Sequence, residues 1–277
     1  MKFKSIIIFL LIFFFVPSKI LASEKNFSVM CSSFPVYDFA RQVVGGEAEI
    51  NLLLKPGTEP HEFEPSALDI KALNDSDIFI FTGKYLEPWA EKFSSSLTKT
   101  LTVDASKNIE LINNDPHIWL DLHRAQEMVK NIAEGFAKKF PEKEKIFQAN
   151  AEAYCEKLKE LDEKFKSLKK NRVLVFAGEF SCNYFMTRYG FEYISAYEGE
   201  NEPSVKKMAE VLKFINENGV KYIFSDAVIS SITRSIAEQT KTEILIFNTA
   251  HVIFQDSPGF LELMSENLKA IEKAINN

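Results

Sequence analysis

The sequence predicts an α/β fold of two lobes, each with a four-stranded parallel sheet flanked by helices, joined by one long backbone helix. Short β-branched or aromatic runs alternate with amphipathic helical segments, which is the pattern of βα units on a parallel sheet. This alternation occurs twice, on either side of a central segment rich in Glu, Lys, Ala and Leu. The central segment contains no Gly or Pro and therefore predicts a single helix.

In the first lobe, apolar runs and amphipathic segments alternate in a regular order. Strands are expected at residues 27–32, 48–54, 78–81 and 101–104, and helices at 36–44, 66–73, 87–94 and 121–139. The second lobe repeats the scheme. Its strands are expected at 173–176, 193–197, 222–225 and 243–247, and its helices at 182–189, 204–218, 231–239 and 259–275.

The connecting helix is predicted over residues 142–170, following Pro141. At 1.5 Å per residue, such a helix would be about 43 Å long. Apolar residues recur along it at steps of three and four, as one packed stripe on an otherwise solvated helix. They are Phe147, Ala151, Tyr154, Leu158, Leu161, Phe165 and Leu168. A charged linker without fixed structure would not require this stripe.

The amino terminus has the pattern of a secretory signal peptide, assigned to residues 1–23. Lys2 and Lys4 precede an apolar run from Ile6 to Val16, and Ala22-Ser23 offers a cleavage site with small residues. The run is short for a membrane span, so no integral membrane segment is expected after cleavage, although an uncleaved anchor remains an alternative. The mature chain then divides into an amino-terminal lobe (24–140), the connecting helix (141–171) and a carboxyl-terminal lobe (172–277).

Composition limits the classes of partner. The formal net charge is −6 with a pI near 5.5, and this argues against nucleic acid or an anionic membrane as the ligand, because either needs a basic face. The three cysteines, an odd number, do not make a disulfide framework. Cys31, Cys155 and Cys182 are expected to be buried thiols, with binding of a soft metal as the alternative for Cys182.

Two of the four histidines lie in tight motifs, Pro60-His61-Glu62-Phe63-Glu64-Pro65 and Asp115-Pro116-His117-Ile118-Trp119-Leu120-Asp121. Neutral imidazole is a good ligand for zinc and similar metals, and neighbouring carboxylates can hold the other ring nitrogen. The two histidines are therefore interpreted as ligands of one metal. Glu62 and Glu64 are candidate acceptors for such bonds, with an exposed role as the alternative. His123 is interpreted as a surface residue.

Four candidate ligands follow predicted strands. His61 and His117 follow the second and fourth strands of the first lobe, while Glu179 and His251 follow the first and fourth strands of the second. In open parallel sheets the ligand crevice lies outside the carboxyl ends of the strands, so the four are expected to converge on one cleft between the lobes. Alternatives to His251 in the same region are Asn248, Thr249, Asp226 or water.

The chain resembles the metal-binding receptors of bacterial ABC importers for zinc and manganese, the TroA/PsaA/ZnuA-type family. The motifs that carry the resemblance are Pro56-Gly57-Thr58-Glu59-Pro60-His61-Glu62-Phe63-Glu64-Pro65, Leu86-Glu87-Pro88-Trp89, the run from Asp115 to Asp121, and Tyr184-Phe185-Met186-Thr187-Arg188-Tyr189-Gly190. The resemblance implies a four-ligand metal site with two residues from each lobe. It also implies delivery of the metal to a membrane permease with its cytoplasmic ATPase, from the periplasm or the extracytoplasmic cell surface, by a receptor expected to be a monomer.

Two ligand positions depart from the family pattern. Zinc-type receptors usually have His at the third position, where this chain has Glu179, as in manganese-type receptors. The fourth position is usually Asp, and here His251 takes its place. Three imidazoles and one carboxylate suit tetrahedral Zn²⁺, whereas Mn²⁺ prefers more oxygen ligands, so zinc is favoured and manganese is the alternative.

Competing function classes are a secreted zinc hydrolase and a metal-binding surface adhesin. A zinc hydrolase would commonly carry His-Glu-x-x-His on a helix, but Pro65 stands where the second histidine should be. Four protein ligands would also close the open position that catalytic zinc needs for water. An enzyme is therefore not expected, whereas the sequence leaves an adhesin role open.

Overall fold

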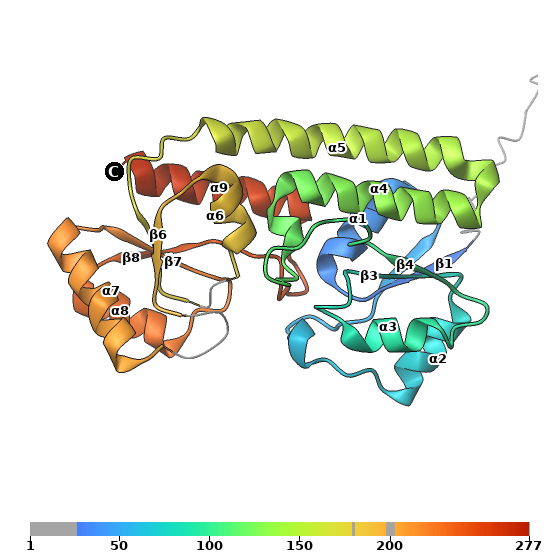
Figure 1. Cartoon of the computed structure of the whole chain (residues 1–277), viewed down its shortest axis with the longest axis horizontal. Coiled ribbons are helices and arrows are strands. Elements are labelled where there is room, and N and C mark those ends of the chain that lie inside the picture. Colours follow the sequence, from blue (N-terminus) through green and yellow to red (C-terminus); the bar gives the residue numbers. More distant parts are fainter. Residues whose placement is uncertain (1–26, 179–180, 198–202, 277) are drawn as a thin grey trace, which may run out of the picture.

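The computed structural model describes residues 27–178, 181–197 and 203–276 of the 277-residue chain. Over these residues the strands form two four-stranded parallel sheets, in the orders β2-β1-β3-β4 and β6-β5-β7-β8 (Figure 1). The first lobe contains β1 (Ser28–Cys31), α1 (Phe34–Val44), β2 (Glu49–Leu52), α2 (Ala67–Asp75), β3 (Ile78–Phe81), α3 (Pro88–Ser94), β4 (Leu101–Asp104) and α4 (Leu122–Lys139). The predicted fold class is confirmed.

The second lobe follows the connecting helix α5 (Glu144–Ser167). It contains β5 (Leu174–Phe176), α6 (Asn183–Tyr189), β6 (Tyr193–Ser195), α7 (Val205–Asn218), β7 (Tyr222–Ser225), α8 (Ser231–Thr240), β8 (Glu243–Ile246) and α9 (Phe260–Asn276). In Figure 1, α5 spans both lobes, with α4 and α9 running beneath it.

Each sheet is covered on both faces, which explains its apolar strands. All four residues of β3 are buried, as expected for a strand inside a parallel sheet with helices on either side. In the first lobe α1 and α4 lie on one side of the sheet, and α2 and α3 on the other (Figure 1). On the second side, Phe79 of β3 stacks on Trp89 of α3, with ring centroids 5.9 Å apart.

The connecting helix is shorter than the sequence predicts. A 3-10 turn, η3 (Pro141–Lys143), precedes it, and the helix ends at Ser167 rather than at residue 170. The backbone of Leu168 is extended, and the Lys170 ammonium group donates to the carbonyls of Phe165 and Lys166. Those carbonyls would have accepted helical N–H groups, so Lys170 satisfies the end of the helix. The 24 residues span about 36 Å.

The stripe predicted on this helix is buried, with Leu168 partly buried beyond its end. Its side chains belong to one continuous hydrophobic core that includes Val29 in the first sheet and Phe176 in the second. Helix α9 extends this shared core, because Phe260 packs edge-on against Phe39 of α1 with ring centroids 4.9 Å apart. The relative placement of the lobes therefore depends on one hydrophobic core that both lobes share.

Two further expectations can be compared with the structure. Cys31, Cys155 and Cys182 are free and buried, as predicted. Across residues 27–178, 181–197 and 203–276, no helix combines the length and apolar character needed to cross a membrane.

Candidate metal centre

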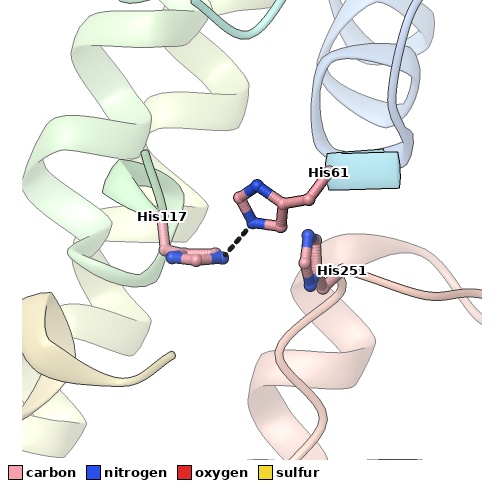
Figure 2. A group of neighbouring side chains, drawn as sticks. All are labelled: His61, His117 and His251. Carbon is pink, nitrogen blue, oxygen red and sulfur yellow. Dashed lines mark hydrogen bonds between the residues drawn. The ribbon is translucent and has the colours of Figure 1, made fainter. Parts of the chain in front are cut away.

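Three histidines from three separate segments converge between the lobes, and their rings face a common centre in Figure 2. His61 lies in a 3-10 turn, η1 (Pro60–Glu62), His117 directly precedes the 3-10 turn η2 (Ile118–Leu120), and His251 lies in the loop after β8. One ligand atom from each lies within 4.8 Å of those of the other two. The Nε2 atoms of His61 and His117 are 3.4 Å apart.

The position of His61 is set by local capping and by a contact between the two lobes. Pro60 starts the 3-10 turn, and the Glu59 carboxylate accepts a hydrogen bond from the His61 backbone N–H at 3.1 Å. Gly57 adopts a left-handed conformation (φ 82°), which a glycine tolerates without strain. Its N–H donates to the carbonyl of Ile253, two residues beyond His251, at 2.8 Å.

His117 is held by Asp115. The Asp115 Oδ1 atom lies 2.7 Å from His117 Nδ1 and accepts from the His117 backbone N–H at 2.9 Å. Burial acts to raise the pKa of Asp115, but the hydrogen bonds from His117 and Asn183 outweigh it, and the pKa lies below its usual range. Because an ionised carboxylate only accepts, Nδ1 carries the hydrogen of this contact, and Nε2 is the nitrogen on the side of His61.

The loop that carries His251 is fixed from within the second lobe. Ala250 has a left-handed backbone (φ 60°), and its N–H donates to the Asn248 side-chain oxygen at 2.8 Å. Asn267 of α9 bonds both the N–H and the carbonyl of Asn248, each at 2.8 Å. The Asp226 carboxylate accepts from the hydroxyl and the backbone N–H of Thr249. These bonds hold an otherwise strained loop in one conformation.

A contact from the first lobe completes this support. The indole N–H of Trp119, two residues after His117, donates to the Thr249 carbonyl at 2.7 Å. The Trp119 side chain is fully buried, so its N–H needs such a partner. The bond ties the His117 segment directly to the His251 loop.

The low pKa and the surroundings of His251 suit the binding of a cation. Burial, reinforced by the nearby His117 and His61, holds the pKa of His251 well below its usual range, so the ring is neutral. Its Nε2 atom is 3.3 Å from Glu59 Oε1. Even so, this buried nitrogen has no hydrogen-bond partner among the described residues. A buried polar atom of this kind needs an explanation, and a bound metal would supply one.

The remaining residues named from the sequence lie at exposed positions, in or beside the loop that carries His251, or outside the described residues. Glu179 lies outside the described residues. Glu62 and Glu64 are exposed, and so is His123 on α4, 3.9 Å from Glu127, as predicted for a surface histidine. Asp226 and Thr249 bond to each other and Asn248 bonds to neighbouring backbone, so the described contacts of all three support the loop.

Sequence reasoning missed Glu59 and Trp119 as residues of this site. The only signal in the sequence for these two residues was proximity, because both lie within two positions of a predicted ligand. Their contacts to His251 and Thr249, however, join segments more than 100 positions apart, and no local pattern predicts such pairs.

The chain is similar to proteins that are described as zinc-binding. The zinc-binding protein AdcA of Streptococcus pyogenes is 31% identical over 293 residues, covering 92% of this chain, and the chain spans 57% of that relative's length. The Zn(II)-bound ZnuA-like domain of Streptococcus pneumoniae AdcA superposes with a TM-score of 0.79 at 28% identity, covering 91% of this chain and 99% of the domain.

A third similar structure is the laminin-binding protein Lmb of Streptococcus agalactiae, described as bifunctional, with adhesin and metal-transporting activity. It has a TM-score of 0.80 at 26% identity and covers 90% of this chain and 99% of its own. The family model of the periplasmic component A of zinc-uptake complexes (ZnuA) matches residues 29–274. Since this match extends over nearly all described residues, the chain belongs to the ZnuA family.

Proposed function

We propose that this protein is an extracytoplasmic solute-binding protein that captures a zinc ion between its lobes and delivers it to an ABC permease. The ion would be bound by His61, His117 and His251, with Glu179 as the fourth ligand. Glu179 is proposed from its place after β5, the strand next to β7 at the centre of the second sheet. Zinc is the transported cargo, and manganese is the alternative.

The distance between His61 and His117 is the observation that carries this proposal. Two nitrogens bound at about 2.0–2.1 Å to a tetrahedral zinc ion lie about 3.4 Å from each other. The two Nε2 atoms are 3.4 Å apart. Two imidazole Nε2 atoms approach this closely when a hydrogen bond or a shared cation joins them. The ring of His251, whose Nε2 has no hydrogen-bond partner among the described residues, lies beside both, with its centroid 4.8 Å from that of His61 and 4.9 Å from that of His117.

Partner and location follow from family membership. The permease would work with a cytoplasmic ATPase, and the receptor would act as a monomer in the periplasm or on the extracytoplasmic cell surface. The similarity to Lmb keeps a second role as a surface adhesin in consideration. Adhesion would require a second binding surface, because the three histidines are proposed to bind the metal.

A catalytic role is not part of the proposal. Pro65 stands where a zinc hydrolase of the His-Glu-x-x-His type would have its second histidine, and η1, which carries His61, is a single 3-10 turn rather than a long helix. With Glu179 as fourth ligand the ion would have no open position for a reacting water.

We further propose the domain boundaries given by the sequence: a signal peptide at 1–23, lobes at 24–140 and 172–277, and the connecting segment at 141–171. The signal peptide lies outside the described residues. Proteolytic mapping and amino-terminal sequencing of the exported protein would test these boundaries.

Metal analysis of the purified protein tests the main proposal. We expect one zinc ion per chain, retained in competition with manganese. The double variant His61→Ala/His117→Ala should lose the ion, whereas His123→Ala, which removes an exposed histidine from α4, should keep it. Stoichiometric, tight zinc in the double variant would refute the site. Loss of cellular zinc accumulation on deletion of the gene would support transport.

A further inference from the structure

Helix α6 of the second lobe contacts both ends of the segment that carries His117. This segment runs from Asp115 to Asp121 and belongs to the first lobe. The first turn of α6 bonds to Asp115 and its last turn bonds to Asp121. No part of the metal site described above accounts for this double contact, although the sequence of α6 is one of the four motifs that carry the family resemblance.

The first contact is made by Asn183 and Tyr184. The Asn183 amide donates to Asp115 Oδ2 at 3.1 Å. The other oxygen of the same carboxylate, Oδ1, contacts the ring of His117. The Tyr184 hydroxyl donates to the Asp115 carbonyl at 2.9 Å and accepts from the backbone N–H of Ile112 at 2.8 Å. The start of α6 therefore fixes the residue that orients the His117 ring.

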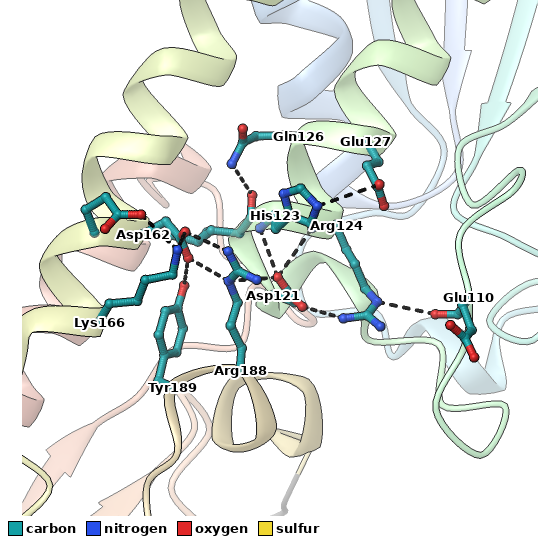
Figure 3. Close-up of polar contacts among 12 residues, drawn as sticks. Glu110, Asp121, His123, Arg124, Gln126, Glu127, Asp162, Lys166, Arg188 and Tyr189 are labelled. Atoms are coloured by element: carbon teal, nitrogen blue, oxygen red, sulfur yellow. Dashed lines mark hydrogen bonds and ion pairs between the residues drawn. The ribbon is translucent and has the colours of Figure 1, made fainter.

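The second contact is made by Arg188 (Figure 3). Its guanidinium group forms two bonds of 2.6 Å to the two carboxylate oxygens of Asp162 on α5. Its Nε atom is also 3.0 Å from Asp121 Oδ1. Asp121 is the residue that caps α4, accepting from the backbone N–H groups of His123 and Arg124. Arg188 thus joins α6 to the connecting helix and to the end of the His117 segment.

Two carboxylates of this network are buried. Asp121 and Asp162 are almost fully buried. Burial acts to raise the pKa of Asp162, but hydrogen bonds from Arg188, Lys166 and Tyr189 outweigh it and lower the pKa to about 2. Burying an ion pair adds little net stability, because desolvation offsets the attraction between the charges. Removing either partner is nevertheless strongly destabilising, because it leaves a buried charge uncompensated.

We propose that α6 is an inter-lobe clamp, formed by Asn183, Tyr184 and Arg188, which positions His117 against the second-lobe ligand His251. Arg188 is its principal positioning residue. The inference rests on the proposed capture of a metal ion, and it adds that affinity depends on residues that do not touch the ion. Because the clamp holds both ends of a seven-residue segment, its loss would let His117 move relative to the second lobe.

The test compares Arg188→Met and Tyr184→Phe with Lys166→Met in the full protein. Lys166 also pairs with Asp162, at 2.8 Å, but it lies on α5 and its ion pairs are with α5 residues, so it is a matched control. Zinc affinity is measured by competition with a chelating indicator. Ligand geometry is read from the visible absorption spectrum of the Co²⁺-loaded protein, which general destabilisation of the fold would not shift.

We expect Arg188→Met and Tyr184→Phe to lower zinc affinity about tenfold or more, the range seen when residues that support metal ligands are lost, and to alter the Co²⁺ spectrum. Lys166→Met should change neither. Arg188→Lys keeps the charge but cannot span two carboxylates with the same geometry, and should recover part of the affinity.

Wild-type affinity and an unchanged Co²⁺ spectrum in a folded Arg188→Met protein would overturn the clamp. If that variant does not fold, the test rests on Tyr184→Phe, which removes one hydroxyl group and leaves no buried charge without a partner. Unchanged zinc affinity and an unchanged Co²⁺ spectrum in Tyr184→Phe would also overturn the proposal. Measurements on the wild-type protein distinguish failure of the proposed function from failure of the clamp. Failure of wild type to bind zinc would refute the proposed function, whereas tight wild-type binding with unaltered clamp variants would refute the clamp alone.

Discussion

The Oδ1 atom of Asp115 lies 2.7 Å from Nδ1 of His117, so the ring's remaining nitrogen, Nε2, faces His61. A carboxylate in this position fixes both the tautomer and the orientation of a metal-binding imidazole, and makes the ring a stronger base. Asp115 also accepts from the backbone N–H of the same histidine. One acidic residue therefore determines which nitrogen of His117 is presented and where.

Replacing Asp115 with Asn should weaken zinc binding about 10- to 100-fold while leaving the protein folded. The amide retains the size of the side chain but loses the charge that favours the Nδ1–H tautomer. Competition titration with a zinc indicator measures the change. Asp75→Asn, which alters an exposed carboxylate at the end of α2, is the control. Equal zinc affinity in the two variants would show that His117 is oriented without Asp115.

His251→Asp should lower the affinity for zinc relative to manganese. It exchanges a nitrogen ligand, which suits Zn²⁺, for oxygen, which Mn²⁺ accepts more readily. Glu179→His should instead raise the affinity for zinc relative to manganese. Parallel titrations of both metals give the ratio of dissociation constants. If His251→Ala binds both metals as tightly as wild type does, His251 only lines the cleft and the preference for zinc loses its main support.

Zinc should be released as the solution is acidified. Protons compete with the ion for each ligating imidazole, so affinity should fall about tenfold per pH unit for every ring that protonates. Since burial places the folded-state pKa of His251 well below its usual range, the metal-free fold binds fewer protons there than the unfolded chain does. The stability from this ring is present above about pH 6.5 and is lost as the pH falls through the folded-state pKa.

Thermal unfolding with and without zinc, from pH 7.5 to pH 5, measures both effects. The increase in melting temperature produced by zinc should shrink at each step toward pH 5, and the melting temperature of metal-free wild type relative to metal-free His251→Ala should fall over the same range. A zinc-induced increase of the same size at pH 5 would indicate a site built mainly from carboxylates.

Glu87→Gln should remove a dependence of stability on pH that does not involve the metal. Burial raises the pKa of Glu87 to about 7 from 4.5, while hydrogen bonds from Ser32 and Gly83 act in the opposite direction. A raised carboxyl pKa gives stability that is present below about pH 4.5 and is lost as the pH rises through 7. At about 1.4 kcal/mol per pKa unit, the loss is on the order of 3 kcal/mol.

Chemical denaturation of the metal-free protein between pH 5 and pH 8 measures this term. The wild-type free energy of unfolding should include a contribution that declines over this range and is absent from Glu87→Gln. Glu91→Gln, at an exposed position in the first turn of α3, should follow the wild type. Parallel curves for Glu87→Gln and wild type would mean that Glu87 is ionised throughout.

The secondary structure could be predicted because its signals are local. Alternating apolar runs located every strand of the two sheets to within two residues at either end, and the stripe from Phe147 to Phe165 marked the buried side of α5. The ends of α5 could not be predicted, because they depend on which group satisfies the last carbonyls. Lys170 does so by folding back, which the absence of Gly and Pro does not reveal.

The sequence alone determined the residue types available for metal binding and their places at the ends of strands. Only the tertiary structure decided that the nitrogens of His61 and His117 lie 3.4 Å apart, and that His251 faces them with a buried nitrogen lacking a hydrogen bond. The reason is physical: a strand end is fixed by local periodicity, whereas a distance between side chains of the two lobes depends on how the lobes are held together. Three features hold the lobes here: the core shared through α5 and α9, the bond from Trp119 to Thr249, and the salt bridges of Arg188. The contacts involved join residues up to 222 positions apart.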